Sequence, residues 1–193
     1  MKNGMKKGLI ILLILVCLLA GCAQKSPQKS PQNLSTVNQS VNRANRVNLS
    51  ANSTVADLLP DNMMGMHKFV ALKGKPALEF VKRSHRGPIK YVKDIALVHY
   101  LGNDSMMLVW ITEYPSAKIA ENQTLLMVKG MKKFGSVWES VNETSFGNLK
   151  VYYVPGKDQY FFCKGKYMIY LIPVNMNRSA VEKFALKVYS VLP

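Results

Sequence analysis

Met63-Met64-Gly65-Met66-His67 is a local cluster of residue types that bind soft metal ions. Thioether sulfur suits monovalent copper, and it keeps this ability outside the cytoplasm, where a thiol oxidises. A metal site here would make the protein an extracytoplasmic copper carrier or an enzyme, and we keep this as the alternative function. Met64 and Met66 would also share one face of a strand and pack there. Packing is the interpretation that we favour, so we expect no bound metal and no cofactor.

The other residue types that perform catalysis form no local pattern. His67, His85 and His99 are separated by 18 and 14 residues, which matches no local metal-ligand spacing. The sequence has neither a nucleophile elbow nor a glycine-rich phosphate loop. Cys163 lies in an apolar run, Tyr160 to Cys163, and is expected to be a buried and inert thiol. We therefore predict that the protein is not an enzyme.

A basic loop covers residues 82–87. Its cationic side chains are Lys82, Arg83 and Arg86. These three are the candidate anion-binding residues, and phosphate, an acidic glycan or lipid headgroups are the ligands that they would suit. Four lysines in two other predicted turns would extend the basic surface if the turns cluster: Lys73, Lys75, Lys164 and Lys166. The simpler interpretation is a basic surface that is only solvated.

The N-terminus is organised like an export signal. Three lysines lie within residues 1–7, and Gly8 to Ala20 is an uninterrupted apolar stretch of 13 residues. An untilted membrane span needs about 20 residues, so this stretch fits the core of a signal peptide better. The next residues, Leu19-Ala20-Gly21-Cys22, resemble the lipobox of prokaryotic lipoproteins at all four positions. The resemblance implies cleavage before Cys22 and attachment of a diacylglycerol to the Cys22 thiol.

A lipid at Cys22 would fix the location of the protein. Two acyl chains hold a protein stably on a bilayer, whereas one chain holds it weakly. Lys25 and Lys29 would add attraction to anionic headgroups. The alternative is an uncleaved anchor helix over residues 8–23. Both interpretations place the following residues outside the cytoplasmic membrane, so we expect a cell-membrane lipoprotein that faces the outside of the cell.

Residues 24–54 predict a flexible tether. The segment consists mainly of Ser, Asn, Gln and Pro with a repeated Lys-Ser-Pro-Gln, and it lacks aromatic residues, so it cannot bury enough surface to fold. Coil scaling gives it a reach of roughly 30 Å. Of the net charge of +15, the first 21 residues hold +3 and the tether +4, which leaves +8 for residues 55–193. Export separates the protein from nucleic acid, so this positive charge does not indicate nucleic-acid binding.

Glycosylation sequons of the form Asn-x-Ser/Thr are more frequent than chance allows. Eight of the 14 asparagines begin one, where composition alone gives about 1.4. Asn122 is the weakest candidate because we expect it inside a helix. The seven expected sites are Asn33, Asn38, Asn48, Asn52, Asn103, Asn142 and Asn177. A lipobox together with many sequons favours an archaeal cell surface.

Residues 55–193 predict a single α+β domain, after a signal peptide (1–21) and a lipid-anchored tether (22–54). A helical turn is expected at 55–60. Expected strands cover 66–72, 77–81, one or two segments of 89–101, 106–112, 137–141, 149–154, 159–163 and 167–174. Expected helices cover 115–134 and a segment from Asn177 or Ser179 to Leu192. This order favours an antiparallel sheet with two helices on one face, and it is compatible with a strand-strand-helix duplication.

These observations together predict a membrane-anchored surface lipoprotein. Its domain would have a binding or envelope-structural role without catalysis. The expected partners are the membrane, through Cys22, and an anionic envelope component or another protein. Exposed aromatic residues beside a cleft would indicate a binding module, whereas an exposed apolar patch would indicate a subunit of an envelope assembly.

Overall fold

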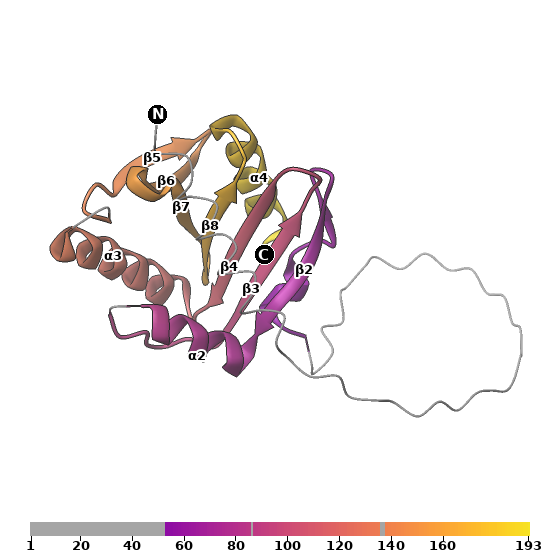
Figure 1. The fold of residues 1–193 in the computed structure, drawn as a ribbon. Helices are drawn as coiled ribbons and strands as arrows, with labels where there is room; N and C mark the ends of the chain where they lie inside the picture. The colour runs from indigo at the N-terminus through magenta and orange to yellow at the C-terminus, as the bar shows by residue number, and fades with distance from the viewer. Residues whose placement is uncertain (1–52, 86, 136–137) are drawn as a thin grey trace, which may run out of the picture. The chain divides into compact units, whose positions relative to one another are not determined.

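The alternating apolar segments pair into one antiparallel sheet of eight strands (Figure 1). The computed structural model describes residues 53–85, 87–135 and 138–193. The strands are β1 (Asn62–Met63), β2 (Met66–Lys73), β3 (Asp94–Leu101), β4 (Met106–Glu113), β5 (Asn142–Phe146), β6 (Leu149–Val154), β7 (Gln159–Lys164) and β8 (Tyr167–Val174). Their spatial order is β1-β2-β3-β4-β8-β7-β6-β5, so β4 and β8 lie at the centre. The expected α+β class with an antiparallel sheet is confirmed.

Helices connect and cover these strands. They are the α-helices α2 (Gly74–Ser84), α3 (Ala117–Phe134) and α4 (Arg178–Val191), and the 3-10 helices η1 (Val55–Leu58) and η3 (Pro155–Lys157). Side-chain caps begin two of them: Ser116 accepts the Ile119 N–H, and Asn177 accepts the Ala180 N–H. Gly74 has a φ of 61°, a conformation that glycine adopts freely, and it turns the chain directly from β2 into α2.

One face of the sheet packs against η1 and α4. Its buried residues occupy alternate positions of the central strands, for example Val109 and Ile111 on β4 and Ile169 and Leu171 on β8. On α4, the residues that meet them are Val181, Phe184, Ala185 and Val188. These positions follow the helical spacing that the sequence predicts, so one stripe of α4 is buried. We call this side of the sheet the α4 face.

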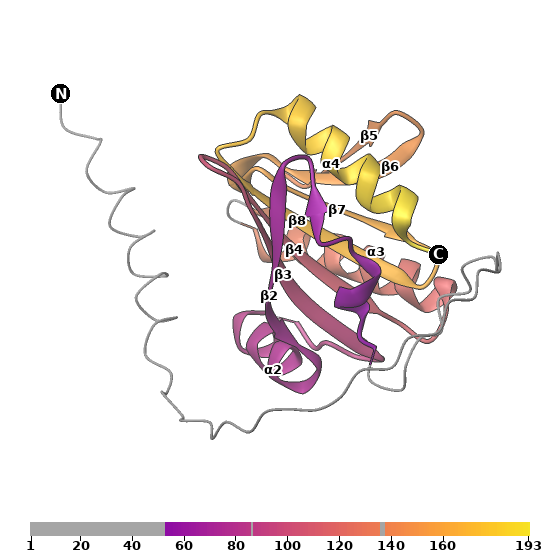
Figure 2. The same ribbon diagram turned by 90° about the vertical axis from the view of Figure 1, so that its right-hand side faces the viewer.

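The opposite face packs against α2 and α3, so the helices lie on both sides of the sheet (Figures 1 and 2). A row of four aromatic rings crosses it from β4 to β6: Trp110, Tyr170, Phe161 and Tyr152. Neighbouring ring centroids in this row are 5.8, 5.4 and 5.1 Å apart. Such ring pairs stabilise a fold by about 0.5–1.5 kcal/mol each beyond their burial. α3 covers the row with Met127, Val128 and Met131.

Several expectations about individual elements are wrong. Residues 77–81 lie in α2 and form no strand, because Ala77 and Val81 have the helical i, i+4 spacing and both face the sheet. The strand expected at 137–141 is absent from residues 138–141, and β5 begins at Asn142 instead. We expected two helices on one face of the sheet, whereas the structure has three α-helices on two faces. The strand order does contain two four-strand halves, but α3 and α4 cover opposite faces, so a duplication would not extend to the helices.

The strands define two ends of the sheet. At the proximal end, β2 and β4 finish and β3 and β8 begin; the described chain also enters there, since the Val55 N–H donates to the Asp94 carboxylate over 2.8 Å. At the distal end lie the β1–β2 turn, the β3–β4 turn and the last residues of β8. Figure 2 shows α2 at the proximal end, on the other side of the sheet from the segment where the described chain begins.

Removal of one ring from the aromatic row should strongly destabilise the domain. Phe161 is fully buried, so Phe161→Ala leaves a cavity under α3 and should lower the free energy of unfolding by about 3–5 kcal/mol. The matched control is Phe69→Ala on the same face, whose side chain is 56% exposed; it should change stability by less than about 0.5 kcal/mol. Urea unfolding measures both, and equal losses would contradict the packing described here.

Candidate functional site

The Met63–His67 cluster is split between the two faces of the sheet. Met63 and Met66 pair across the β1–β2 hairpin and are buried in the core on the α4 face. His67 is the next residue along β2, so its exposed side chain points to the opposite face. Met66 and His67 therefore cannot bind the same ion, which argues against the copper alternative. Within the described residues, no group of three His, Cys, Asp or Glu side chains is arranged to hold a metal.

The predicted basic turns do not form one anion-binding rim. Lys164 donates to the carbonyls of Tyr189 and Leu192 at the end of α4. Lys166 lies 2.7 Å from the Glu113 carboxylate, and Lys93 lies 3.0 Å from it. Burial alone would raise the pKa of Glu113, but the hydrogen bonds from these two lysines outweigh it and hold the pKa below its ordinary value. These three lysines therefore bind carbonyl and carboxylate groups of the domain itself, at its proximal end.

The expected anion-binding residues Lys82 and Arg83 lie in the last turn of α2, and both are exposed. Lys82 makes an i, i+3 ion pair with Glu79 over 3.1 Å. Such exposed pairs contribute little to stability. Both side chains therefore stay accessible to a partner. Arg86, the third expected residue, is outside the described residues.

Cys163 is half-buried, so the expectation of a buried thiol is wrong, although its surroundings still disfavour reactivity. Its sulfur lies 2.8 Å from the Thr124 hydroxyl of α3, beside a hollow of about 400 Å³. Burial raises the pKa of Cys163, although the hydrogen bond with Thr124 opposes this shift. A raised pKa leaves little of the reactive thiolate at neutral pH. Thr124 also completes the Asn122 sequon, and its buried hydroxyl donates to the Ala120 carbonyl inside α3.

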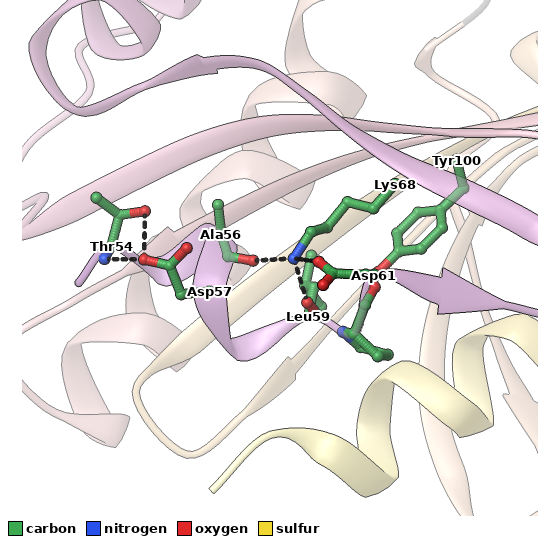
Figure 3. A network of polar contacts seen from close by, with 8 residues as sticks. Thr54, Ala56, Asp57, Leu59, Asp61, Lys68 and Tyr100 are labelled. Atoms are coloured by element: carbon green, nitrogen blue, oxygen red, sulfur yellow. Dashed lines mark hydrogen bonds and ion pairs between the residues drawn. The ribbon is translucent and has the colours of Figure 1, made fainter. Parts of the chain in front are cut away.

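The first described residues, 54–61, are held to the sheet by a polar junction (Figure 3). Its centre is Lys68 of β2, whose side chain is only 11% exposed. The ammonium group lies 2.6 Å from the Leu59 carbonyl, 3.4 Å from the Ala56 carbonyl and 2.8 Å from the Asp61 carboxylate. The contact with Lys68 lowers the pKa of Asp61. One lysine thus neutralises the carbonyl end of η1 and ties residues 56–61 to β2.

Tyr100 completes the junction from β3. Its hydroxyl donates to the Pro60 carbonyl over 2.6 Å. Burial, together with the charge of Asp61, raises the pKa of Tyr100, so the hydroxyl keeps its proton and remains a donor. Thr54 and Asp57 close the start of η1, because the Thr54 N–H donates to the Asp57 carboxylate over 2.6 Å. The junction therefore fixes residues 54–61 before the first strand begins.

Part of the α2/α3 face is covered by neither helix. Two cross-strand rows lie there, toward the distal end, and we call them the open rows. The first is Phe69, His99, Leu108 and Ile172, and the second is His67, Leu101, Met106 and Val174. Phe69 and Leu101 are 56% and 45% exposed. Burial lowers the pKa of His99, which keeps its ring neutral beside Phe69 at 6.2 Å. Of the eight residues, His67, Phe69 and Leu101 are exposed and the other five are half-buried, with Ile172 packed against the cluster under α3. The open rows are thus a partly exposed, mainly apolar surface of the described domain.

Two expected glycosylation sites lie at the distal end: Asn103 is in the β3–β4 turn, and Asn177 follows β8. Asn142 instead begins the edge strand β5, level with Leu171 in the middle of β8. All three are exposed. Asn177 caps α4 through its side-chain oxygen, which leaves the amide nitrogen for a glycan. Asn122 lies within α3, as expected. The lipidation site Cys22 and the sequons at Asn33, Asn38, Asn48 and Asn52 are outside the described residues.

Comparison of the chain with family models, with curated proteins and with solved structures finds no match. None of the described helices combines the length and hydropathy needed to span a membrane. Sequence reasoning missed both Lys68 and the open rows. Lys68 resembles an ordinary surface lysine in an alternating strand. The open rows depend on the registers of β2 with β3 and of β4 with β8, which join residues 30 or more positions apart.

Substitution of Lys68 tests whether the junction holds the start of the domain. Lys68→Met keeps the apolar stem but removes the donor from two backbone carbonyls, so unfolding free energy should fall by about 1–3 kcal/mol. Protease cleavage within residues 53–61 should also become faster. The matched control is Lys183→Met on the exposed side of α4, which should change neither measurement. A Lys68→Met protein as stable and as resistant as the control would show that the junction is dispensable.

Proposed function

We propose that this chain is a lipid-anchored surface protein whose folded domain acts by binding and without catalysis. The observation that carries the proposal is the lipobox sequence ending at Cys22. It is followed by a segment with few large apolar residues and then by a well-packed domain. The polar junction supports it, because it fixes the chain directly after the tether. A tether of about 30 residues gives the domain a reach of roughly 30 Å from the bilayer.

The two ends of the sheet support an outward orientation. The chain enters at the proximal end, whereas Asn103 and Asn177 lie at the distal end. Glycans are bulky and need solvent, so an arrangement with the distal end away from the membrane accommodates them. The open rows lie on this distal half and would face the surroundings of the cell.

We assign the binding role to the open rows and name as their partner another envelope protein with an apolar surface. Phe69 and Leu101 are exposed aromatic and aliphatic side chains, which soluble domains rarely gather unless they bind something. The neutral His99 adds no charge that such a partner would have to desolvate. The copper alternative is less well supported, because Met66 and His67 face opposite sides of β2.

Two cysteines in the leader provide a matched test of the anchor. Cys22→Ser removes the thiol that would be acylated, so the protein should move from the membrane fraction to the soluble fraction. Cys17→Ser changes the same atom type five residues earlier, inside the apolar stretch, and should leave the protein on the membrane. Mass spectrometry of the native chain should show an acylated Cys22 at its N-terminus. Membrane retention of the Cys22→Ser protein would favour an uncleaved anchor helix instead.

Charge placed in the open rows tests the binding role. Cross-linking of intact cells should join the wild-type chain to a partner and shift its mass on a denaturing gel. Leu101→Asp should abolish this adduct because it puts a carboxylate into the apolar contact. Leu186→Asp, at an exposed leucine of α4 on the opposite side of the domain, is the control and should preserve it. An adduct that survives Leu101→Asp, or no adduct with the wild type, would contradict the assignment.

A further inference from the structure

The positive charge of the domain is concentrated in one short stretch. Residues 73–93 contain seven basic residues and one acidic residue, a net charge of +6. The rest of residues 55–193 contains twelve basic and ten acidic residues, a net charge of +2. This stretch is α2 together with the segments that join it to β2 and β3. The surplus charge therefore belongs to one place on the fold.

These charges face solvent. α2 buries Ala77 and Val81 against Ile95 and Leu97, which leaves its other side free. The exposed cations of the stretch are Lys73, Lys75, Lys82, Arg83, Lys90 and Lys93. Two of them pair with carboxylates, Lys82 with Glu79 and Lys93 with Glu113. Within the described part of the chain, the other four form no ion pair.

Two aromatic side chains protrude beside the cations. Phe80 is 42% exposed on α2, and Tyr91 is 62% exposed in the segment after it. Tyr91 also has a φ of 61°, a backbone conformation that bulky residues avoid. Aromatic residues among lysines and arginines are the composition of surfaces that lie at a membrane interface: the cations attract headgroups and the rings enter the boundary below them.

The basic surface of α2 and residues 87–93 also lies at the end of the sheet where the proposed tether would join the domain. The Val55 N–H donates to Asp94, the residue directly after this stretch, so the described chain enters at the same end of the sheet as α2, although on the opposite face (Figure 2). A chain anchored through Cys22 would bring this end of the domain to the bilayer first. The exposed cations of α2 lie apart, with Lys75 in its first turn and Lys82 and Arg83 in its last, which suits a plane of headgroups better than one compact anion.

We propose that α2 and residues 87–93 form a second, electrostatic contact with anionic lipid headgroups. The inference rests on the proposed lipid anchor, which supplies the proximity. Phe80 and Tyr91 enter the interface, while Lys75, Lys82 and Arg83 contact phosphate groups. The domain then rests on its proximal end, and Asn103, Asn177 and the open rows point away from the membrane. The tether together with this contact gives the protein a defined orientation that the tether alone would not.

Vesicle binding by a chain without lipid tests this contact separately from the anchor. The probe protein is residues 22–193 with Cys22→Ser, and the vesicles are phosphatidylcholine with or without one-third phosphatidylglycerol. Binding is expected only to the anionic vesicles and should weaken as salt rises. Lys82→Glu with Arg83→Glu should weaken it about tenfold or more. Lys132→Glu with Lys133→Glu, in the last turn of α3, changes the net charge equally and should stay within about twofold of the parent.

The aromatic contribution has its own pair of variants. Phe80→Gln should weaken vesicle binding even at high salt, whereas Leu126→Gln, at an exposed leucine of α3, should not. Circular dichroism checks that each variant is folded. No binding to anionic vesicles, or equal losses in the α2 and α3 charge variants, would overturn the proposal. Equally tight binding to a soluble acidic glycan through Lys82 and Arg83 would overturn it as well. An acylated native chain with no vesicle binding here would leave the anchor standing and reject only this contact.

Discussion

The pairing of β4 with β8 joins the first four strands of the domain to the last four. Eight residue pairs connect them, from Met106 with Val174 to Glu113 with Tyr167. Both strands are apolar on both faces because each face is covered by other elements. Val109 and Leu171 contribute to the core under α4, and Trp110 and Tyr170 contribute to the aromatic row. Without this pairing, neither core would be continuous, and the open rows would not cross four strands.

The strands that carry most of the core could be read from the sequence. β4, β6, β7 and β8 have apolar runs of strand length with turn residues between them, and α3 and α4 have a buried stripe and a capping residue. β5 could not be read, because Asn142–Phe146 is an edge strand with only Phe146 buried, and such a strand has no alternation. α2 was misread for a different reason. Gly74 and Pro76 are typical of a turn, and the short apolar run after them fits a strand as well as a helix.

The candidate surfaces were harder to predict from the sequence than the fold was. The sequence shows that residues 82–86 are basic. Their proposed contact with the membrane depends on the position of α2 at the end of the sheet where the chain enters. Phe69 and His99 face each other only through the register of β2 with β3, in which a shift occurs between Val70 and Leu72. Lys68 looked like a solvated residue, because nothing in its neighbourhood shows that backbone carbonyls from residues 56 and 59 surround it.

The polar junction has a mechanical consequence for a tethered protein. Residues 55–60 run alongside β3, from Val55 at Asp94 to Pro60 at Tyr100. Tension on the proposed tether would pull this segment lengthwise, so the Val55, Lys68 and Tyr100 hydrogen bonds would be loaded together in shear. Bonds loaded one after another would open like a zipper at a lower force. If the domain is tethered as proposed, this geometry would resist such a force without a disulfide within residues 53–193, where Cys163 is the single cysteine.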